Sequence, residues 1–498
     1  MPPSSLVQQV TDLDNFLQPS MFSSLPANFF THLQPTPLPQ PYIIAVSRAA
    51  AEQFNLAPES LRAPGSVEAL TGNTDILGAN PLASVYSGHQ FGAWAGQLGD
   101  GRAILLGDAI DKHQQRFEVQ LKGAGPTPYS RSGDGRAVLR SSIRELLCSE
   151  AMYALGIPTS RALAITGSDQ GVMRETAETS AVVTRLAPSF SRFGSFEHWY
   201  YNNRPDELKI LADFVIRHHY PQALKQPNPY QAFLSTVTKK TAELIACWQS
   251  VGFMHGVMNT DNMSILGLTL DYGPFGFMEK YDERHICNHT DQQGRYSYRM
   301  QPTIGHWNTH ALGQALLPLI GSVEDTQLAL DCYSSSFSNK WEALLRKKLG
   351  LLTIQKDDKE LTDQLFNIMQ ENHADFTHTF RYLSHLENHA SSKDDDFVSL
   401  FSNTKAALDW LELYRARLVS EGSQAEERHR RMQASNPKYV LRNYLAQIAI
   451  EKAQNKDFSE VQKLLAILEH PFDEQPEHHQ YADEPPTWAQ HLEISCSS

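Results

Sequence analysis

The sequence predicts an α+β protein in which a β-rich lobe is followed by an α-rich lobe. Its composition is that of a globular protein, with 41% hydrophobic and 20% charged residues in a chain of 498. This length suggests several domains or one large enzyme. From about residue 81 to 205, short strand patterns alternate with glycine turns and one strong amphipathic helix. From residue 206 onward, helical periodicity dominates.

Extensions are expected on both sides of these two lobes. Residues 1–80 form an N-terminal extension whose stretch Pro35–Pro41 is too rich in proline for a helix. Residues 81–205 form the β-rich lobe and residues 206–350 the α-rich lobe. We expect a C-terminal helical extension over 351–470, and an acidic, proline-rich linker with a cysteine-containing tail over 471–498.

Charge and hydropathy exclude several classes of partner. The chain carries 43 basic and 56 acidic residues, a net charge of −13, and therefore lacks the basic surface that nucleic acid or an anionic membrane would require. The longest apolar runs are far shorter than the roughly 20 residues that span a bilayer. The first Lys or Arg residue is Arg48, so neither a secretory signal nor a mitochondrial presequence is indicated. We expect a cytoplasmic protein; its oligomeric state is not predicted.

Cysteine usage agrees with that compartment. The five cysteines have no CxxC spacing, which argues against a zinc site or a disulfide framework. Cys148 and Cys247 fall within amphipathic helical patterns and are expected in the core. Cys496 lies third from the C-terminus, where packing gives no reason for a thiol.

Three successive features of the β-rich lobe favour phosphate binding. The segment 96–107 places three glycines within six residues before an apolar strand, although an ordinary hairpin turn has the same pattern. In the strand 116–122, Lys122 lies on the polar face, as an ordinary exposed lysine also would. The amphipathic helix 136–155 carries Glu145 at the edge of its apolar stripe. A glycine turn, a strand lysine and a helix glutamate, in this order, are typical of the nucleotide lobe of kinases.

A loop in the α-rich lobe predicts a metal site. Asn262 is followed nine residues later by Asp271, in Asp271-Tyr272-Gly273. An amide and a carboxylate supply hard oxygens that suit Mg²⁺ bound together with ATP phosphates. The loop matches His-Gly-Asp-Leu-x-x-x-Asn of small-molecule kinases, except that Val257 stands where the catalytic aspartate would be. Because valine cannot accept a proton, ordinary phosphoryl transfer lacks its base.

These motifs, taken together, resemble the selenoprotein O (YdiU) family. The resemblance extends over nearly the whole chain and is carried by these segments: Gly99-x-Gly101-Arg102, Gln120-Leu121-Lys122-Gly123, Ser132-Gly133-Asp134-Gly135-Arg136, His255–Asn262, Asn436-Pro437-x-x-x-Leu441-Arg442-Asn443 and the near-terminal Cys496. The chain is similar to bacterial members with cysteine where many eukaryotic members have selenocysteine.

The resemblance implies a kinase-like bilobal fold that binds ATP in a flipped orientation. Such enzymes transfer AMP from ATP to Ser, Thr or Tyr hydroxyls of proteins, and some bacterial members use UTP. Their metal is Mg²⁺, with Mn²⁺ as an alternative.

The family motifs also imply a role for each matching residue. Asp261 would be the proton acceptor, Lys122 would bind phosphates and pair with Glu145, and Asn262 and Asp271 would hold the metal. The remaining nucleotide contacts would come from Gly99, Gly101, Arg102, Asp134, Gly135, Arg185 and Arg192, with Asp271 also facing the nucleotide.

Ordinary explanations exist for several of these residues. Arg185 and Arg192 have the planar donors that phosphate binding uses, but surface arginines have them too. Asp261 fits a turn cap or an outer metal partner as well as a base. Asp134-Gly135 fits a plain turn.

Two alternative functions stay open. One is a kinase in which Asp261 replaces the missing aspartate. The other is a nucleotide-binding scaffold that transfers nothing.

A redox role for Cys287 and Cys496 is a separate hypothesis. It rests on the resemblance to a selenoprotein family. Reduced, inert thiols are the alternative.

Overall fold

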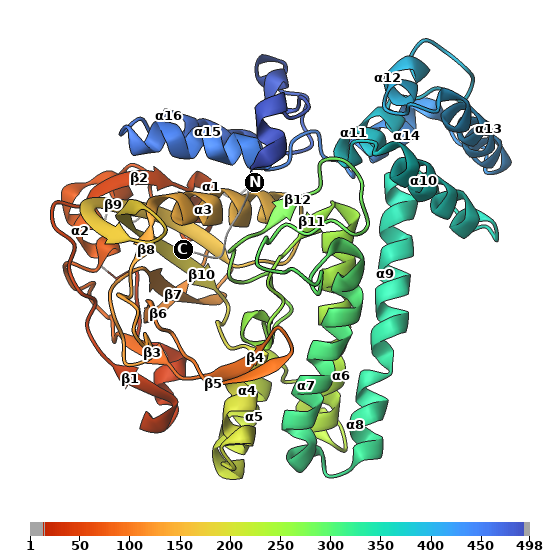
Figure 1. Cartoon of the computed structure of the whole chain (residues 1–498). Helices are drawn as coiled ribbons and strands as arrows, with labels where there is room; N and C mark the ends of the chain where they lie inside the picture. The colour runs from red at the N-terminus through yellow and green to blue at the C-terminus, as the bar shows by residue number, and fades with distance from the viewer. Residues whose placement is uncertain (1–12, 14, 493–498) are drawn as a thin grey trace, which may run out of the picture.

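An eight-stranded antiparallel sheet occupies the N-terminal half of the computed structural model, which describes residues 13 and 15–492 (Figure 1). The main path runs β1–β3–β6–β7–β10–β9–β2, and β8 pairs with β10. The strands of this sheet are β1 (Phe30–His32), β2 (Tyr42–Val46), β3 (Leu82–Ser84), β6 (Ala103–Ile110), β7 (Arg116–Lys122), β8 (Ala137–Val138), β9 (Arg161–Met173) and β10 (Ala177–Ala187).

Each face of the sheet packs against helices. Apolar residues of β7, such as Val119 and Leu121, join a core with α1 (Arg48–Gln53) and α2 (Pro64–Thr71). The opposite face of β9 and β10 packs on α3 (Leu139–Ala154), whose stripe of Ile143, Leu146 and Leu147 is fully buried. The polar face of β7 is therefore buried as well. Sequence patterning placed Lys122 on the polar face of this strand, but alternation alone does not show that a helix covers that face.

The second half is helical, and a long loop interrupts it. The helices that flank this loop are α4 (Phe193–Tyr201), α5 (Pro205–His219), α6 (Pro229–Ser250), α7 (Gln301–Ile320), α8 (Val323–Leu330) and α9 (Cys332–Lys348). Between α6 and α7, β11 (Phe253–Met254) pairs with β12 (Gly276–Phe277) and closes the base of a loop over residues 255–275. This loop contains the short 3-10 helix η5 (Thr260–Asn262).

A separate hairpin connects the two halves. Its strands, β4 (Ser87–Gln90) and β5 (Ala93–Gln97), form a two-stranded sheet outside the main one. The hairpin contacts both α4 and η5, and Figure 1 shows it lying between the large sheet and the helices.

The C-terminal helices form two groups. One shares a core with Met254 of β11 and with residues that follow β12, such as Met278 and Tyr281. It comprises α10 (Asp358–Asn372), α11 (Phe376–Leu383), α12 (Asp394–Ser399), α13 (Thr404–Ser420) and α14 (Ala425–Gln433). The other, α15 (Asn443–Gln454) and α16 (Ser459–Leu468), packs on α3 (Figure 1). Beyond α16, residues 471–489 pack onto the body: Tyr481 is buried, and Glu474 pairs with Arg381. No helix in the described ranges is long and apolar enough to cross a membrane.

Candidate active site

The register of the sheet gathers charged side chains on one face. In the pairing of β7 with β10, Lys122 lies opposite Val183 and Gln120 lies opposite Arg185. Side chains two residues apart in a strand share a face, as do directly paired residues. Lys122, Gln120 and Arg185 therefore point to the same side of the sheet, towards α3.

Glu145 of α3 meets the two cations at this face. Its carboxylate lies 2.6 Å from Lys122 Nζ and 2.5 Å from Arg185 Nε. Burial alone would raise the pKa of Glu145, but Arg185 and Lys122 outweigh burial and lower it. Burial lowers the pKa of Lys122 to about 8, although Glu145 opposes that shift. Glu145 is thus held ionised and fixes both cations.

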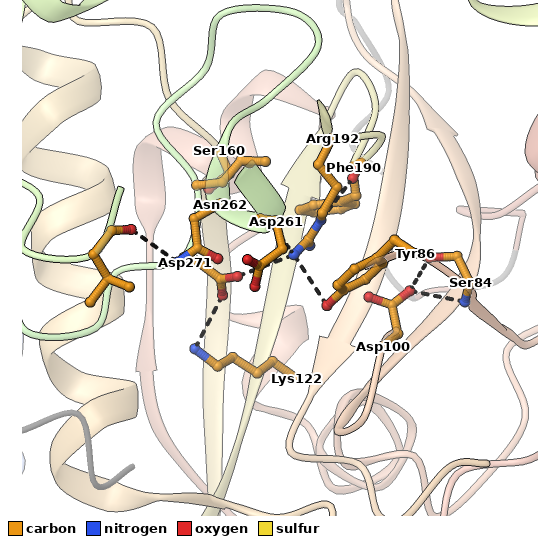
Figure 2. A network of polar contacts seen from close by, with 12 residues as sticks. Ser84, Tyr86, Asp100, Lys122, Ser160, Phe190, Arg192, Asp261, Asn262 and Asp271 are labelled. Carbon is orange, nitrogen blue, oxygen red and sulfur yellow. Dashed lines mark hydrogen bonds and ion pairs between the residues drawn. The ribbon is translucent and has the colours of Figure 1, made fainter. Parts of the chain in front are cut away.

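The 255–275 loop brings Asn262 and Asp271 to the same cluster (Figure 2). Asn262 donates its amide N–H to the carbonyl of Val257 at 3.1 Å, which fixes the orientation of the amide. Asp271 adopts a positive φ of 57°, a conformation that Asp tolerates better than most residues. The loop thereby presents a carboxylate and an amide oxygen, the donor types predicted for a metal.

Asp271 lies at the centre of the charge network. Its Oδ1 accepts from Arg185 at 3.0 Å and its Oδ2 from Arg192 at 3.2 Å, while Lys122 Nζ lies 4.0 Å from Oδ1. Burial would raise the pKa of Asp271, but Arg185, Arg192 and Lys122 hold it well below its usual range. The carboxylate is therefore ionised at any physiological pH.

Asp261 lies beside this network but is not part of its ion pairs. Arg192 donates to the backbone carbonyl of Asp261 at 2.9 Å (Figure 2). The Asp261 carboxylate accepts instead from Gln90 Nε2, at 3.2 Å. Burial raises the pKa of Asp261 to about 6. A carboxylate with this pKa is ionised at neutral pH and is more basic than an exposed aspartate.

A cavity of about 410 Å³ lies over this cluster, within the usual range of ligand pockets. All of the residues predicted to bind nucleotide line it: Gly99, Gly101, Arg102, Lys122, Asp134, Gly135, Arg185, Arg192 and Asp271. Glycine is required at Gly99, where φ is 133° and a Cβ would lie 2.5 Å from Tyr129 Cγ. The glycine turn is thus built into the cavity wall, whereas Glu145, Asp261 and Asn262 do not line it.

Several lining residues were not found by sequence reasoning. Tyr86 lies under Arg192, with the guanidinium 4.5 Å from its ring centre, and its hydroxyl accepts from Arg192 at 3.3 Å. Arg174 lines the rim and pairs with Asp134 at 2.8 Å. Nothing in the local sequence identifies Tyr86. Arg174 lies 40 residues from Asp134, so their pairing depends on the β9–β10 hairpin.

Of the two predicted redox cysteines, the structure describes Cys287. Cys287 is buried beside the 255–275 loop, and its thiol donates to the Pro274 carbonyl at 2.8 Å. Cys496 lies outside the described residues.

Comparison with known proteins decides the family. The family model described as "Protein adenylyltransferase SelO" matches residues 13–469. This chain belongs to the SelO family. It is 60% identical to a protein nucleotidyltransferase YdiU of Herminiimonas arsenicoxydans, over 98% of each chain. It is 54% identical to a YdiU of Burkholderia mallei, over 97% of this chain and 96% of the relative. The family resemblance inferred from the motifs is confirmed.

Proposed function

We propose that this protein transfers AMP from ATP to hydroxyl groups of proteins and releases pyrophosphate. Membership of the SelO family and similarity to protein nucleotidyltransferases over the whole chain support the activity. The observation in the structure that carries the proposal is the convergence of Lys122, Arg185 and Arg192 on Asp271 at one cavity wall. In this proposal, the hydroxyl groups of Ser, Thr and Tyr accept the nucleotidyl group. ATP donates it, and UTP is an alternative donor. The cytoplasm, where both nucleotides are available, is its compartment.

We further propose a kinase-like arrangement of two lobes. Residues 81–205 would be the nucleotide lobe and 206–350 the metal-binding lobe, flanked by extensions over 1–80 and 351–470 and by a tail over 471–498. The position of the cavity supports this division. Lys122 and Arg185 reach it from the sheet, and Asp271 reaches it from the loop between α6 and α7.

Asn262 and Asp271 fit a Mg²⁺ or Mn²⁺ ion. The described residues contain no group of three or more His, Cys, Asp or Glu that could hold a metal, so phosphates and water would have to complete the coordination. Mg²⁺ is commonly bound in this way, through one or two carboxylates and the phosphates of a substrate. The Asp271 carboxylate is held ionised and keeps acceptor sites beyond its two arginine contacts. When bound, the ion would neutralise phosphate charge.

The cations of the cavity suit pyrophosphate as the leaving group. We propose that ATP binds flipped, with its α-phosphate towards the acceptor. Lys122, Arg185 and Arg192 would then stabilise the charge that develops on the β- and γ-phosphates. The acceptor oxygen bonds to the α-phosphorus, the bond from that phosphorus to the bridging oxygen of pyrophosphate breaks, and the hydroxyl proton passes to Asp261. Burial makes the Asp261 carboxylate more basic than that of an exposed aspartate. This supports the assignment of Asp261 as the proton acceptor.

Labelled ATP tests the proposal. A protein extract is incubated with Mg²⁺ and ATP labelled at the α- or the γ-phosphorus, with wild type, Asp271→Ala, and Asp409→Ala as an exposed control. We expect label only from the α position, lost in Asp271→Ala and kept in Asp409→Ala. Label only from the γ position would establish a kinase, and no label from either would leave a nucleotide-binding scaffold. UTP labelled at the α-phosphorus reports the alternative donor.

A further inference from the structure

The β4–β5 hairpin is attached to the η5 segment residue by residue. The His89 N–H donates to Thr260 Oγ1 at 2.7 Å, Gln90 Nε2 donates to Asp261 Oδ2 at 3.2 Å, and the Phe91 N–H donates to Asn259 Oδ1 at 3.1 Å. Three consecutive residues of the hairpin, 89–91, thus bind residues 259–261, which directly precede Asn262 in the loop. So close a match fixes the hairpin relative to Asp261.

The turn of this hairpin is strained, and the same loop holds it. Gln90 pairs with Ala93, so Phe91 and Gly92 form a two-residue turn, with φ values of 51° and 82°. A positive φ suits Gly92 but is costly for a bulky residue such as Phe91. The Phe91 N–H also donates to the Tyr296 hydroxyl at 3.1 Å, and that hydroxyl donates to Asn259 at 2.7 Å. Backbone strain of this kind persists where the surroundings over-determine it, often at functional sites.

The buried carboxylate of Glu197 links the hairpin to α4 and to η5. Glu197 of α4 is fully buried and bonds His89 Nδ1 at 2.6 Å through one oxygen. Its other oxygen accepts from the Thr260 hydroxyl. The hairpin, α4 and η5 are therefore joined through one side chain, and Gln90 projects from a rigid support.

The Asp261 carboxylate depends on this hairpin for its position. In the part of the chain that the structure describes, Gln90 donates the hydrogen bond to Oδ2, and Oδ1 has no hydrogen-bond partner. Gly88 approaches so closely that a Cβ there would lie 2.9 Å from Asp261 Oδ1. The carboxylate is thus confined on one side by the backbone of β4 and held on the other by Gln90.

We propose that Gln90 is a positioning residue for AMP transfer, which holds the Asp261 carboxylate at the angle that the acceptor hydroxyl requires. This inference rests on the proposed function, in which Asp261 accepts the proton of that hydroxyl. Gln90 does not line the nucleotide cavity, and its side chain contacts the proposed base instead. Its loss is expected to affect the chemical step and not the binding of ATP.

The test compares Gln90→Met with Gln97→Met. Methionine has nearly the shape of glutamine but no N–H donor. Gln97 lies on the same hairpin and is exposed, so its variant controls for the substitution itself. We expect Gln90→Met to lower kcat for AMP transfer roughly 10- to 100-fold, as misplaced catalytic groups do. The KM for ATP and the thermal unfolding midpoint should match those of Gln97→Met and wild type.

Each other outcome is decisive. A kcat within about twofold of wild type would overturn the inference, as would a loss that follows weaker ATP binding or lower thermal stability. If Gln90→Met does not fold, Gln90→Asn, whose amide is one methylene too short, is judged by the same criteria. A wild-type protein that transfers no AMP would overturn the proposed function together with this inference. Normal wild-type transfer with an unaffected variant overturns this inference alone.

Discussion

At the scale of single residues, the site is a balance of charge around two carboxylates. Glu145 binds Lys122 and Arg185, and Asp271 binds Arg185 and Arg192. Arg185 belongs to both pairs because its guanidinium offers separate nitrogens, Nε to Glu145 and Nη2 to Asp271. A single ammonium cannot reproduce that geometry.

Arg185→Lys should therefore damage the site while keeping its charge. One lost hydrogen bond to a charged group costs about 1.5–3 kcal/mol, or roughly 10- to 100-fold in kcat/KM for ATP. Steady-state kinetics measure the change. Arg116→Lys, at the far end of β7 and paired with Asp108, is the control. Equal kinetics in the two variants would show that activity does not require Arg185 to bind Glu145 and Asp271 through separate nitrogens.

Asp261→Asn removes the proposed base and keeps the size of the side chain. We expect AMP transfer to fall about 10²- to 10⁴-fold, the usual contribution of a general base, with ATP affinity unchanged. Calorimetric binding of a non-hydrolysable ATP analogue and the transfer rate are measured on the same preparation. Transfer at more than about a tenth of the wild-type rate would exclude Asp261 as the base.

At the scale of elements, a buried histidine of α4 links this helix to the β4–β5 hairpin. His198 of α4 forms a 2.8 Å hydrogen bond through Nδ1 with the Ser87 hydroxyl of β4. Burial lowers the pKa of His198 to about 4, below the value of about 6.5 in an unfolded chain. The unfolded state therefore binds a proton more readily than the folded state between these values.

This difference makes the protein less stable in acid. The contribution of neutral His198 is complete above about pH 6.5 and is lost as the pH falls towards 4, with a loss of about 2 kcal/mol by pH 5. Urea unfolding of wild type and His198→Asn at pH 7 and pH 5 measures it. The variant should lose less free energy of unfolding between the two pH values than wild type. Equal losses would show that His198 does not titrate in this way.

The close approach of β4 to η5 gives a second test of the hairpin. Gly88→Ala would place a methyl group 3.0 Å from Asp261 Cβ and 2.9 Å from its Oδ1. We expect slower AMP transfer, with kcat falling roughly tenfold or more because small displacements of a reacting group are costly. Gly171→Ala, which meets nothing within 4 Å, should match wild type. Equal kcat values would show that η5 adjusts freely.

Sequence patterns predicted the local parts of this site better than its long-range contacts. The helix of Glu145, expected over 136–155, is α3 at Leu139–Ala154, because its apolar stripe is a local signal. Tyr86 under Arg192 depends on a contact between residues 106 apart. The anchoring of Asp261 by Gln90 depends on one between residues 171 apart. Periodicity does not report such contacts.

At the scale of the whole molecule, two C-terminal helices pack against the helix that positions Glu145. α15 and α16 pack on α3, the helix of Glu145, and their buried residues share a core with it. Arg442, 2% exposed, precedes α15 and binds both Glu279 and Asp375. Asp375 also caps α11. Arg442 thus joins α15, α11 and the segment after β12.

Arg442→Met should destabilise the whole protein. Removing one partner of a buried ion pair leaves uncompensated charges and costs about 3–5 kcal/mol. Denaturant unfolding measures the change. Lys405→Met, which removes an exposed partner of Asp409, should have no measurable effect because surface pairs contribute little. Similar stability in both variants would contradict the role of Arg442.

The proposed reaction moves an adenylyl group from ATP to a protein. The most direct measurement is the intact mass of an acceptor protein after incubation with this enzyme, ATP and Mg²⁺, together with the nucleotide product. We expect a mass gain of one adenylyl group and release of pyrophosphate, both absent with Asp261→Asn. A mass gain of one phosphoryl group with release of ADP would contradict it.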